Sequence, residues 1–430
     1  MKNVVTHLYS DYLRYTDQFR ALPWMDDMLK PVERRLLLGL SKFARNKFEK
    51  SAKIVGMVLG HWHCHGDAST YGSLVSLVQR GYADGQGNWG SPGLEDSKAA
   101  SMRYSECKSN KFLVEGFCEF MDYVPWEELE LDKEPLRLPY FIPIGLIGEG
   151  LIQGISLHTC KIPRYKYPDL IKRLISLIED HPIKHVLIPN LGLNQLYENA
   201  PGEYERICKT GEGVIQCVPK ILVSKSGLQI LSKNPITGLN PLVAFNVEFE
   251  KKNGQSYYTV VDLSKTSLNV FVAPQRGAVS PSFINDIMKI ISVKIHIKIH
   301  VITKDGTVKL IGIDDLLINT YTKWVASYLA KLQFDLAKTN QTLLELNIIL
   351  EIRKILNANP GLQRIDDIVK LNTSNFSSED IEMVCSKHRI KKLIEGNLDI
   401  PGVLAEINDL TNSINNIDSI ALTRIKDIVK

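Results

Sequence analysis

The sequence predicts an α+β protein of several domains. With 430 residues the chain is too long for a single hydrophobic core, and one domain per about 100 to 200 residues gives about three domains. Residues 294–301 alternate apolar and basic side chains, the period of two typical of a half-buried strand. Residues 313–359 contain neither glycine nor proline, a span long enough for an extended helix. We place the domains at residues 1–140, 141–312 and 313–430.

The first domain alternates short helical patterns with turns. Pro31 suits the first turn of a helix, from which Arg34 and Arg35 project away from the apolar stripe. A second helix is predicted near Asp67, and a glycine-punctuated run at residues 84–91 follows it. Two short helices, a bend and a glycine-rich wing outline a helix-turn-helix variant. The apolar stripes of the two helices are Val32, Leu36, Leu37 and Leu40, and Leu74, Val75 and Val78.

Residues 1–60 carry an excess of basic charge. They contain 11 Lys or Arg and 6 Asp or Glu, an excess of 5, whereas the net charge of the whole chain is only +4. Such a patch is compatible with nucleic-acid binding and equally with a solvated helix face. Its cations are Lys30, Arg34, Arg35, Lys42, Arg45, Lys47, Lys50 and Lys53.

The second domain carries the β signals. We predict strands at residues 213–223, 243–250, 257–261 and 294–301. In the last of these, His296 and His300 fall on the solvent face. A shared metal ion there is a weak alternative, because no third ligand is evident nearby.

Two heptad patterns mark the third domain. At about 1.5 Å per residue the first helix reaches on the order of 65 Å. The second helix either folds back along it as an antiparallel coiled coil or joins it in a compact bundle. The two runs are Leu329, Leu332, Leu336, Leu343, Leu346 and Leu350, with Thr339 in the gap, and Val403, Ile407, Leu410, Ile414 and Ile417.

Composition narrows the class of protein. Hydrophobic residues make up 44% and charged residues 23%, which is typical of globular chains, and no run of about 18 apolar residues is present. Residues 1–15 lack the pattern of a secretory signal, so we expect a cytoplasmic protein. Seven cysteines without a Cys-x-x-Cys pair argue against a disulfide framework and a zinc ribbon.

Arg103 and Tyr104 are the strongest candidates for covalent chemistry. A phenol has a pKa of about 10, so it attacks phosphate only with a cation nearby and a site that neutralises the phosphate. Arg103 supplies one fixed charge. Alone, such a pair is far more often part of an ordinary strand edge. His63-Cys64-His65 has no distant partner at ligand spacing, so we predict no metal site in this chain.

Four segments in one order resemble the breakage-reunion (A) subunit of type IIA DNA topoisomerases, the family of gyrase and topoisomerase IV. Weaker similarity continues at residues 150–154, 209–213 and after Asp314, so it spans nearly the whole chain. The four segments are Arg20-Ala21-Leu22-Pro23 with Leu29-Lys30-Pro31-Val32 and Arg34-Arg35; Lys50-Ser51-Ala52-Lys53-Ile54-Val55-Gly56; His63-Cys64-His65-Gly66-Asp67 with Tyr71; and residues 84–91 with Tyr104.

The resemblance implies a fold for each domain and roles for single residues. It implies that residues 1–140 form a winged-helix domain and that residues 141–312 form a mixed α/β tower domain. Residues 313–430 are expected to form a long antiparallel coiled coil, whose far end, around residues 381–393, is a helical dimer gate. Tyr104 attacks DNA and forms a 5′-phosphotyrosyl link, Arg103 stabilises the negative charge, and His65 is the next catalytic candidate. The residues expected to contact DNA are Arg20, Lys30, Arg34, Arg35, Lys53, His63, His65 and Leu151.

Leu151 matches an apolar wedge that enters between base pairs and bends the duplex. Without the resemblance, burial in the core is the default for a leucine. Both interpretations stay open on sequence alone.

The resemblance also implies partners. The chain is expected to form a homodimer within a heterotetramer with a B-type subunit, to bind double-stranded DNA, and to have no membrane association. No obvious carboxylate cluster and no Gly-x-x-x-x-Gly-Lys-Ser/Thr loop is present, so Mg²⁺ and ATP are expected to be held by that B subunit. Because the chain ends soon after the second heptad run, relaxation and decatenation are expected rather than supercoiling, as in compact bacteriophage enzymes.

Two rival functions and three departures qualify this expectation. One rival is a non-catalytic DNA-bending winged-helix dimer, and the other is a metal nuclease that uses His63 and His65. Glu33 stands where many relatives have histidine or glutamine. Asp26 stands where many have arginine, and Met28 stands where glycine is usual. The two acidic residues predict a less positive local field.

Overall fold

The computed structural model describes residues 2–91, 93–110, 116–129, 132–182, 186–192, 195–196, 200–265, 267–362, 364–372, 376–387 and 398–429. The chain divides into two compact units. The first is Met1–Trp324 with Ile428–Lys430, and the second is Val325–Asp427. The domain boundaries predicted at residues 140 and 312 stay predictions. Mixed helices and sheets agree with an α+β chain of more than one domain.

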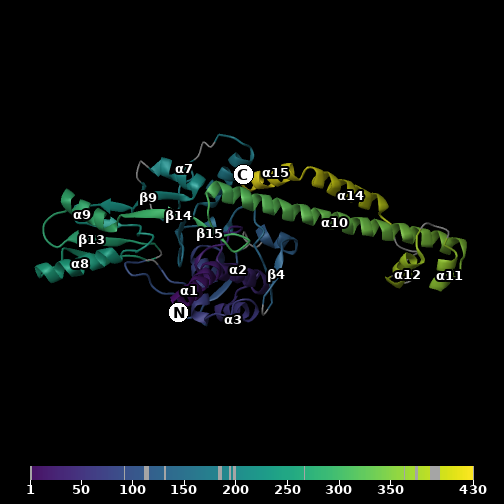
Figure 1. Ribbon diagram of the computed structural model, residues 1–430, viewed down its shortest axis with the longest axis horizontal. Coiled ribbons are helices and arrows are strands. Elements are labelled where there is room, and N and C mark those ends of the chain that lie inside the picture. Colours follow the sequence, from purple (N-terminus) through teal and green to yellow (C-terminus); the bar gives the residue numbers. More distant parts are fainter. Residues whose placement is uncertain are drawn as a thin grey trace. The chain divides into compact units, whose positions relative to one another are not determined.

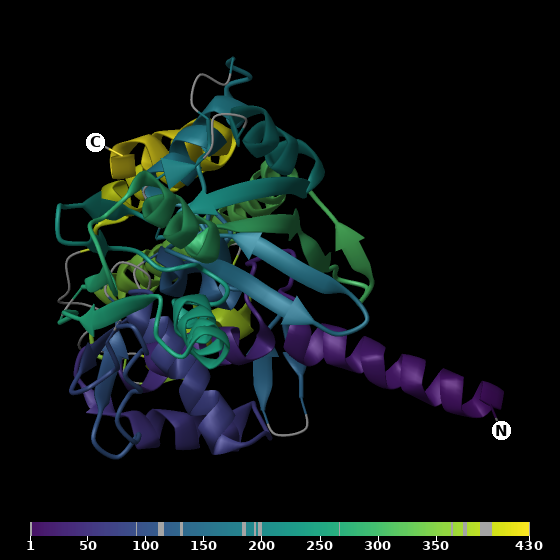
Figure 2. The same ribbon diagram turned by 90° about the vertical axis from the view of Figure 1, so that its left-hand side faces the viewer.

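The first unit begins with several helices and a small three-stranded sheet, and Figure 2 shows α1 projecting from the rest of this unit. Helix α2 starts at Pro31, where the Lys30 backbone N–H donates to Glu33 Oε2 at 3.1 Å. The predicted stripe is confirmed, because Leu36, Leu37 and Leu40 are buried. The helices are α1 (Lys2–Thr16), π-helix η1 (Asp17–Ala21), α2 (Pro31–Phe43), α3 (Ser51–His61) and α4 (Asp67–Gln79); the strands β1 (Glu49–Lys50), β2 (Ala83–Gln86) and β3 (Glu106–Ser109) pair in the order β1-β3-β2.

An antiparallel five-stranded sheet lies next along the chain. The predicted strand at residues 294–301 is confirmed, with Ile295, Ile297, Ile299 and Val301 buried, although it breaks into two strands at Ile299. The sheet order is β6-β7-β14-β9-β8, with β6 (Leu151–Ile155), β7 (Thr159–Pro163), β14 (Val293–Lys298), β9 (Glu212–Val218) and β8 (Gln195–Leu196). The neighbouring elements are η2 (Cys118–Tyr123), β4 (Trp126–Glu128), β5 (Lys133–Pro135), η3 (Ile144–Leu146), α6 (Tyr167–Ile178), α7 (Ala200–Thr210), β15 (His300–Ile302) and β16 (Val308–Leu310).

A four-stranded sheet with two helices forms a separate hydrophobic core, and Figure 1 shows these helices, α8 and α9, beside β13. The predicted strand at residues 257–261 is confirmed as β12. The predicted strand at 213–223 is two strands in different sheets, because Pro219 lacks the N–H that would continue the ladder. The order is β10-β11-β13-β12, with β10 (Ile221–Val223), β11 (Leu228–Ile230), β13 (Val270–Pro274) and β12 (Tyr258–Asp262), covered by α8 (Asn240–Asn253) and α9 (Pro281–Ile291).

Residues 243–250 form a helix, so the strand predicted there is wrong. Helix α8 has Pro241 in its first turn and ends before Gly254, whose φ of 69° is left-handed. Phe245 and Phe249, which alternate with polar residues in the sequence, stack one helical turn apart with ring centroids 6.1 Å apart. The proline and glycine at the two ends were the deciding signals.

The second unit contains most of a long helix and, among its described residues, four shorter helices. The extended helix predicted after Gly312 is confirmed as α10 (Ile313–Ala358), 46 residues long. Thr339 lies 3.5 Å from Glu406, and Arg424 lies 5.4 Å from the Tyr328 ring, so the returning chain runs antiparallel to α10. The shorter helices are α11 (Ile365–Lys370), α12 (Ser378–Lys387), α14 (Ile400–Asn415) and α15 (Ile417–Val429).

The heptad prediction holds along most of this unit and fails at one end. The second run, residues 403–417, is half-buried at every predicted position, as expected for a two-helix pair. Leu350 is 39% exposed, whereas Ile348 and Ile352 are buried against α11 and α12. Residues 388–393 of the predicted dimer gate lie outside the described residues.

Candidate functional site

Tyr104 lies in an exposed turn directly before β3. Its side chain is 64% exposed, and the Arg103 guanidinium lies 4.8 Å from the centre of its ring. A cation this close stabilises negative charge that develops on the phenol or on a phosphate beside it. The predicted pair is therefore adjacent in space and open to a large substrate.

The backbone on both sides of Tyr104 is fixed by the start of helix α3. The Ser51 N–H donates to the Ser105 carbonyl at 3.0 Å, and the Ala52 N–H donates to the Met102 carbonyl at 3.2 Å. Ser105 is fully buried, and its hydroxyl lies 2.8 Å from Ser51 Oγ and 2.9 Å from the Tyr71 hydroxyl. Because the first N–H groups of a helix have no partner within the helix, the tyrosine turn satisfies them and is held in return.

Gly87, in the glycine-rich run, permits this close packing. Its φ is 99°, and a Cβ at this position would lie 3.1 Å from the Tyr104 carbonyl oxygen. A side chain there would be strained and would crowd the turn. The glycine run thus shapes the backbone around Tyr104.

A buried ion pair positions His63. Arg35 binds Glu134 with two hydrogen bonds of 2.5 and 2.8 Å, and its third nitrogen lies 3.0 Å from His63 Nδ1. Because a guanidinium can only donate, His63 Nδ1 accepts and the ring proton lies on Nε2. Burial, with Arg35, His65 and Arg20 nearby, lowers the pKa of His63 to about 4. His63 is therefore a neutral hydrogen-bond donor at physiological pH.

His63, His65 and Arg20 share a hollow of about 320 Å³. The two imidazole rings meet edge to face with centroids 4.6 Å apart, and Arg20, at the end of η1, is exposed. Burial, Arg20 and Arg35 lower the pKa of His65. The cationic Arg20 and the Nε2–H of His63 favour an anion over a metal cation, and no group of three metal-ligating side chains occurs among the residues that the structure describes. Tyr104 does not line this hollow.

The lowered pKa of His63 predicts a loss of stability on acidification. Between pH 6.5 and about pH 4 the unfolded chain takes up a proton at His63 and the folded chain does not, so protons favour unfolding in this window. We expect His63→Gln to flatten the pH dependence of the unfolding free energy by up to about 1.4 kcal/mol per pH unit. Urea unfolding at several pH values measures this pH dependence. His296→Gln, on the exposed face of β14, is the control, and an equal slope in both variants would contradict the prediction.

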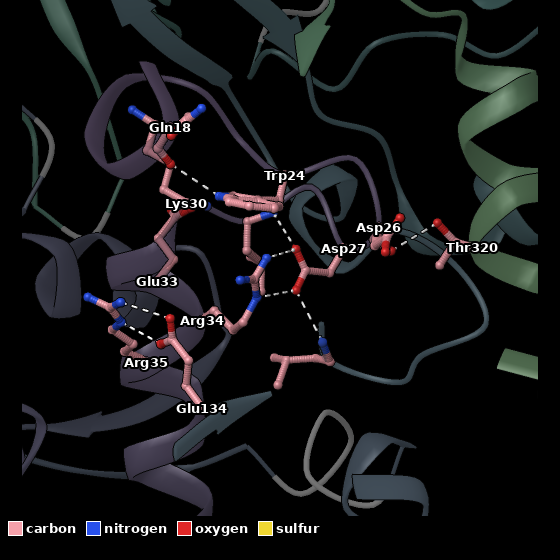
Figure 3. A network of polar contacts seen from close by, with 12 residues as sticks. Gln18, Trp24, Asp26, Asp27, Lys30, Glu33, Arg34, Arg35, Glu134 and Thr320 are labelled. Atoms are coloured by element: carbon pink, nitrogen blue, oxygen red, sulfur yellow. Dashed lines mark hydrogen bonds and ion pairs between the residues drawn. The ribbon is translucent and has the colours of Figure 1, made fainter. Parts of the chain in front are cut away.

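Arg34 and Arg35 are buried, which the sequence did not indicate. Figure 3 shows each guanidinium paired with a carboxylate. Asp27 accepts from Arg34 at 2.7 and 3.0 Å, and it also accepts from the Leu138 N–H at 3.1 Å. Buried charge requires such pairing, since an unpaired charge in the interior is costly. We assign Arg34 a structural role and Arg35 the positioning of His63.

The remaining predicted contacts lie at the surface. Lys30 Nζ donates to the Gln153 carbonyl at 2.7 Å, which joins the start of α2 to β6. Leu151 is half-buried and, with Lys30, lines a hollow of about 380 Å³, so it is not a fully buried core leucine. Lys53 is 52% exposed and pairs with Glu49 at 2.9 Å.

The two acidic departures are paired with cations, and the less positive local field stays a prediction. Glu33 Oε1 lies 2.6 Å from Arg80. Burial acts to raise the pKa of Glu33, but Arg80 and Arg164 outweigh it and hold this pKa below its ordinary value. Asp26 pairs with Lys323 on α10. Each of the two acidic residues therefore has a cationic partner elsewhere in the chain.

Met28, the third departure, adopts a backbone conformation that suits glycine. Its φ is 58°, and its side chain is fully buried. A left-handed φ costs a non-glycine residue about 1 kcal/mol or more. The buried apolar side chain offsets this cost.

Sequence reasoning missed Glu134 and Arg164. Glu134 lies 99 residues from Arg35, so no local spacing indicates the pair. Ser51 belongs to a recognised segment, but its bond to Ser105 depends on tertiary structure.

Throughout the described ranges, no helix is both long and apolar enough to cross a bilayer.

Comparison with known proteins gives one consistent family. A profile of the A subunits of DNA gyrase and topoisomerase IV matches residues 20–430. The A subunit of DNA topoisomerase 4 from Salmonella typhimurium is 33% identical over 45% of this chain and 29% of the relative. Its counterpart from Streptococcus pyogenes is 26% identical over 98% of the chain and 54% of the relative. The A subunit of DNA gyrase from Staphylococcus aureus is 24% identical over 97% of the chain and 50% of the relative, so the chain spans about half the length of these two.

Proposed function

The chain belongs to the A-subunit family of DNA gyrase and topoisomerase IV, and we propose that it is the DNA-cleaving and rejoining subunit of a type II topoisomerase. The exposed pair of Arg103 and Tyr104 on a rigidly held turn carries this proposal. The family membership supports the reaction class, and the pair supports the nucleophile.

In the proposed reaction the Tyr104 hydroxyl oxygen attacks a DNA phosphorus. The new O–P bond forms as the bond from phosphorus to the 3′-oxygen breaks, so the 5′-phosphate stays on Tyr104 and the 3′-oxygen takes up a proton. The phenol proton passes to solvent water, to which Tyr104 is exposed, and His65 stays the next catalytic candidate of this chain. Reversal of the same step rejoins the strand without an external energy source. Arg103 stabilises charge on the phosphate.

The other proposed DNA contacts differ in kind. Arg20, Lys30 and Lys53 offer cationic groups to backbone phosphates, and neutral His63 offers its Nε2–H. Leu151 is the proposed wedge, since an apolar side chain at the edge of a groove can enter between base pairs and bend the duplex.

The proposal requires a second type of subunit. The part of the chain that the structure describes has no carboxylate cluster that fits Mg²⁺, and the sequence has no phosphate-binding loop for ATP. We propose that a B-type subunit supplies both, and that the chain works as a homodimer within a heterotetramer in the cytoplasm. Mg²⁺, when bound there, neutralises charge at the phosphate.

Strand passage tests this function. We expect the purified chain with its B-type subunit, ATP and Mg²⁺ to relax supercoiled plasmid and to separate interlinked rings, with little introduction of negative supercoils. Loss of both activities when either subunit is omitted supports the proposal. Bent DNA without strand passage, or nicking by the chain alone, would instead favour the DNA-bending or the nuclease function.

A further inference from the structure

The segment that leads to Tyr104 is attached to a second part of the first unit. After β2 the chain makes a closed loop in which the Ser97 N–H donates to the Ser91 carbonyl at 3.0 Å and the Ser91 N–H donates to Ser97 Oγ at 2.9 Å. We call residues 93–97 the tip of this loop. The tip contacts the four-stranded sheet β10-β11-β13-β12, more than 130 residues further along the chain.

Three contacts hold the tip on that sheet. Leu94 packs against its hydrophobic core. The Leu94 N–H donates to Asp262 Oδ2 at 2.8 Å, and Asp96 forms an ion pair with Lys233. Gly93 permits this approach, because a Cβ there would lie 2.9 Å from the same Asp262 oxygen.

The other end of the segment is fastened beside Tyr104. The Ala100 N–H donates to the Asn88 carbonyl at 2.9 Å, and the Tyr71 hydroxyl donates to the Ala100 carbonyl at 2.7 Å. Ser105 is buried against Ser51. The chain between the tip and Tyr104 is short and is bonded midway to Asn88 and Tyr71, so the tip and the turn belong to one hydrogen-bonded segment.

We infer that Leu94 and Asp96, with Lys233 and Asp262, form a clasp that makes the four-stranded sheet a positioning element for Tyr104. The inference rests on the proposed function for its catalytic consequence, but the contacts themselves do not. Movement of the sheet is transmitted to the nucleophile through the clasp.

The ion pair of the clasp can separate at a small cost in free energy. Asp96 and Lys233 have 53% and 37% of their side chains exposed, so their pair is screened by water and contributes little to stability. Both residues also border a hollow of about 640 Å³, so they can separate without leaving a void in packed core. Leu94 is the part that excludes water, and removing its side chain weakens the clasp most.

Charge reversal in the assembled enzyme tests the clasp. The chain, together with its B-type subunit plus Mg²⁺, is mixed with saturating end-labelled DNA, and the fraction of covalently linked DNA is measured. We expect Asp96→Lys and Lys233→Asp each to lower this fraction about threefold and Leu94→Ala about tenfold, corresponding to about 0.7 and 1.4 kcal/mol. The double variant Asp96→Lys/Lys233→Asp restores it to within about twofold, because the pair re-forms with opposite polarity.

Two further readouts separate positioning from folding. Melting temperature and DNA affinity are expected to stay unchanged in the charge variants. Glu95→Lys is the matched control, since Glu95 is exposed on the same tip and pairs with no cation among the described residues. A similar loss in Glu95→Lys, or no recovery in the double variant, would overturn the inference.

Hydrogen exchange of the chain tests the coupling without activity. The Ala100 and Tyr104 amides, bonded to Asn88 and Ser101, are expected to exchange several-fold faster in Asp96→Lys and normally in the double variant. If wild type forms no covalent link but exchange responds, the proposed function fails and the clasp stands. If wild type links DNA but neither readout responds, the clasp fails alone.

Discussion

Replacing Tyr104 by phenylalanine is expected to abolish covalent attachment of DNA. The phenyl ring can keep the contact with Arg103, whereas the attacking oxygen is lost. We expect strand passage and covalent linkage to fall by more than about 10⁴-fold, the order of loss that follows removal of an enzyme's nucleophile. DNA affinity should stay within about twofold, because binding depends mainly on cations elsewhere on the surface. Gel shift and detergent-quenched cleavage assays measure the two quantities.

Tyr12→Phe provides the matched control. Tyr12 is also an exposed tyrosine, with 58% of its surface accessible against 64% for Tyr104, and it lies on α1. Full activity in this variant shows that loss of an exposed hydroxyl is harmless in general. Residual linkage in Tyr104→Phe near the wild-type level would remove Tyr104 from the mechanism.

Replacing Glu134 by alanine is expected to give the largest loss of stability. The variant leaves the Arg35 guanidinium buried without its carboxylate, and breaking a buried pair in this way costs about 3 to 5 kcal/mol. His63 then loses the fixed donor at its Nδ1, so DNA cleavage should fall as well. Chemical denaturation measures the free energy of unfolding.

Glu128→Ala is the control for this prediction. Glu128 lies in the same β4–β5 hairpin and pairs with Lys133 at 2.7 Å, but both side chains are largely exposed. Its removal is expected to leave the unfolding free energy nearly unchanged. The variant Arg35→Met/Glu134→Leu should be more stable than Glu134→Ala, because no charge is left buried. Equal stability of all three variants would contradict a buried pair.

Much of the fold could be predicted from local patterns. Pro31 and a leucine stripe were enough for α2, and the absence of glycine and proline was enough for α10. Alternation was enough for β14, where buried isoleucines face a single core. The same alternation misled at residues 243–250, because Pro241 and Gly254 favour a helix there.

The candidate site was predictable only in part. Tyr104, Arg103 and the two histidines could be named because they stand in short recognisable segments. The orientation of Arg34 and Arg35 could not, because it depends on Asp27 and Glu134, which reach them only after folding. The pairing of Glu33 could not be predicted either, since its partner Arg80 lies 47 residues away. The spacing of apolar residues indicates which face of a helix or strand is buried, but it does not indicate which charged residues pair.

The most direct test of the account is to identify the residue that carries the DNA. Covalent complex formed by the chain, its B-type subunit, Mg²⁺ and DNA is digested with nuclease and then with trypsin, which cleaves after Arg103 and Lys108. Mass spectrometry is expected to find a nucleotide, linked through its 5′-phosphate, on Tyr104 in the peptide of residues 104–108. A nucleotide on any other residue, or cleaved DNA alongside an unmodified 104–108 peptide, would contradict Tyr104 as the nucleophile.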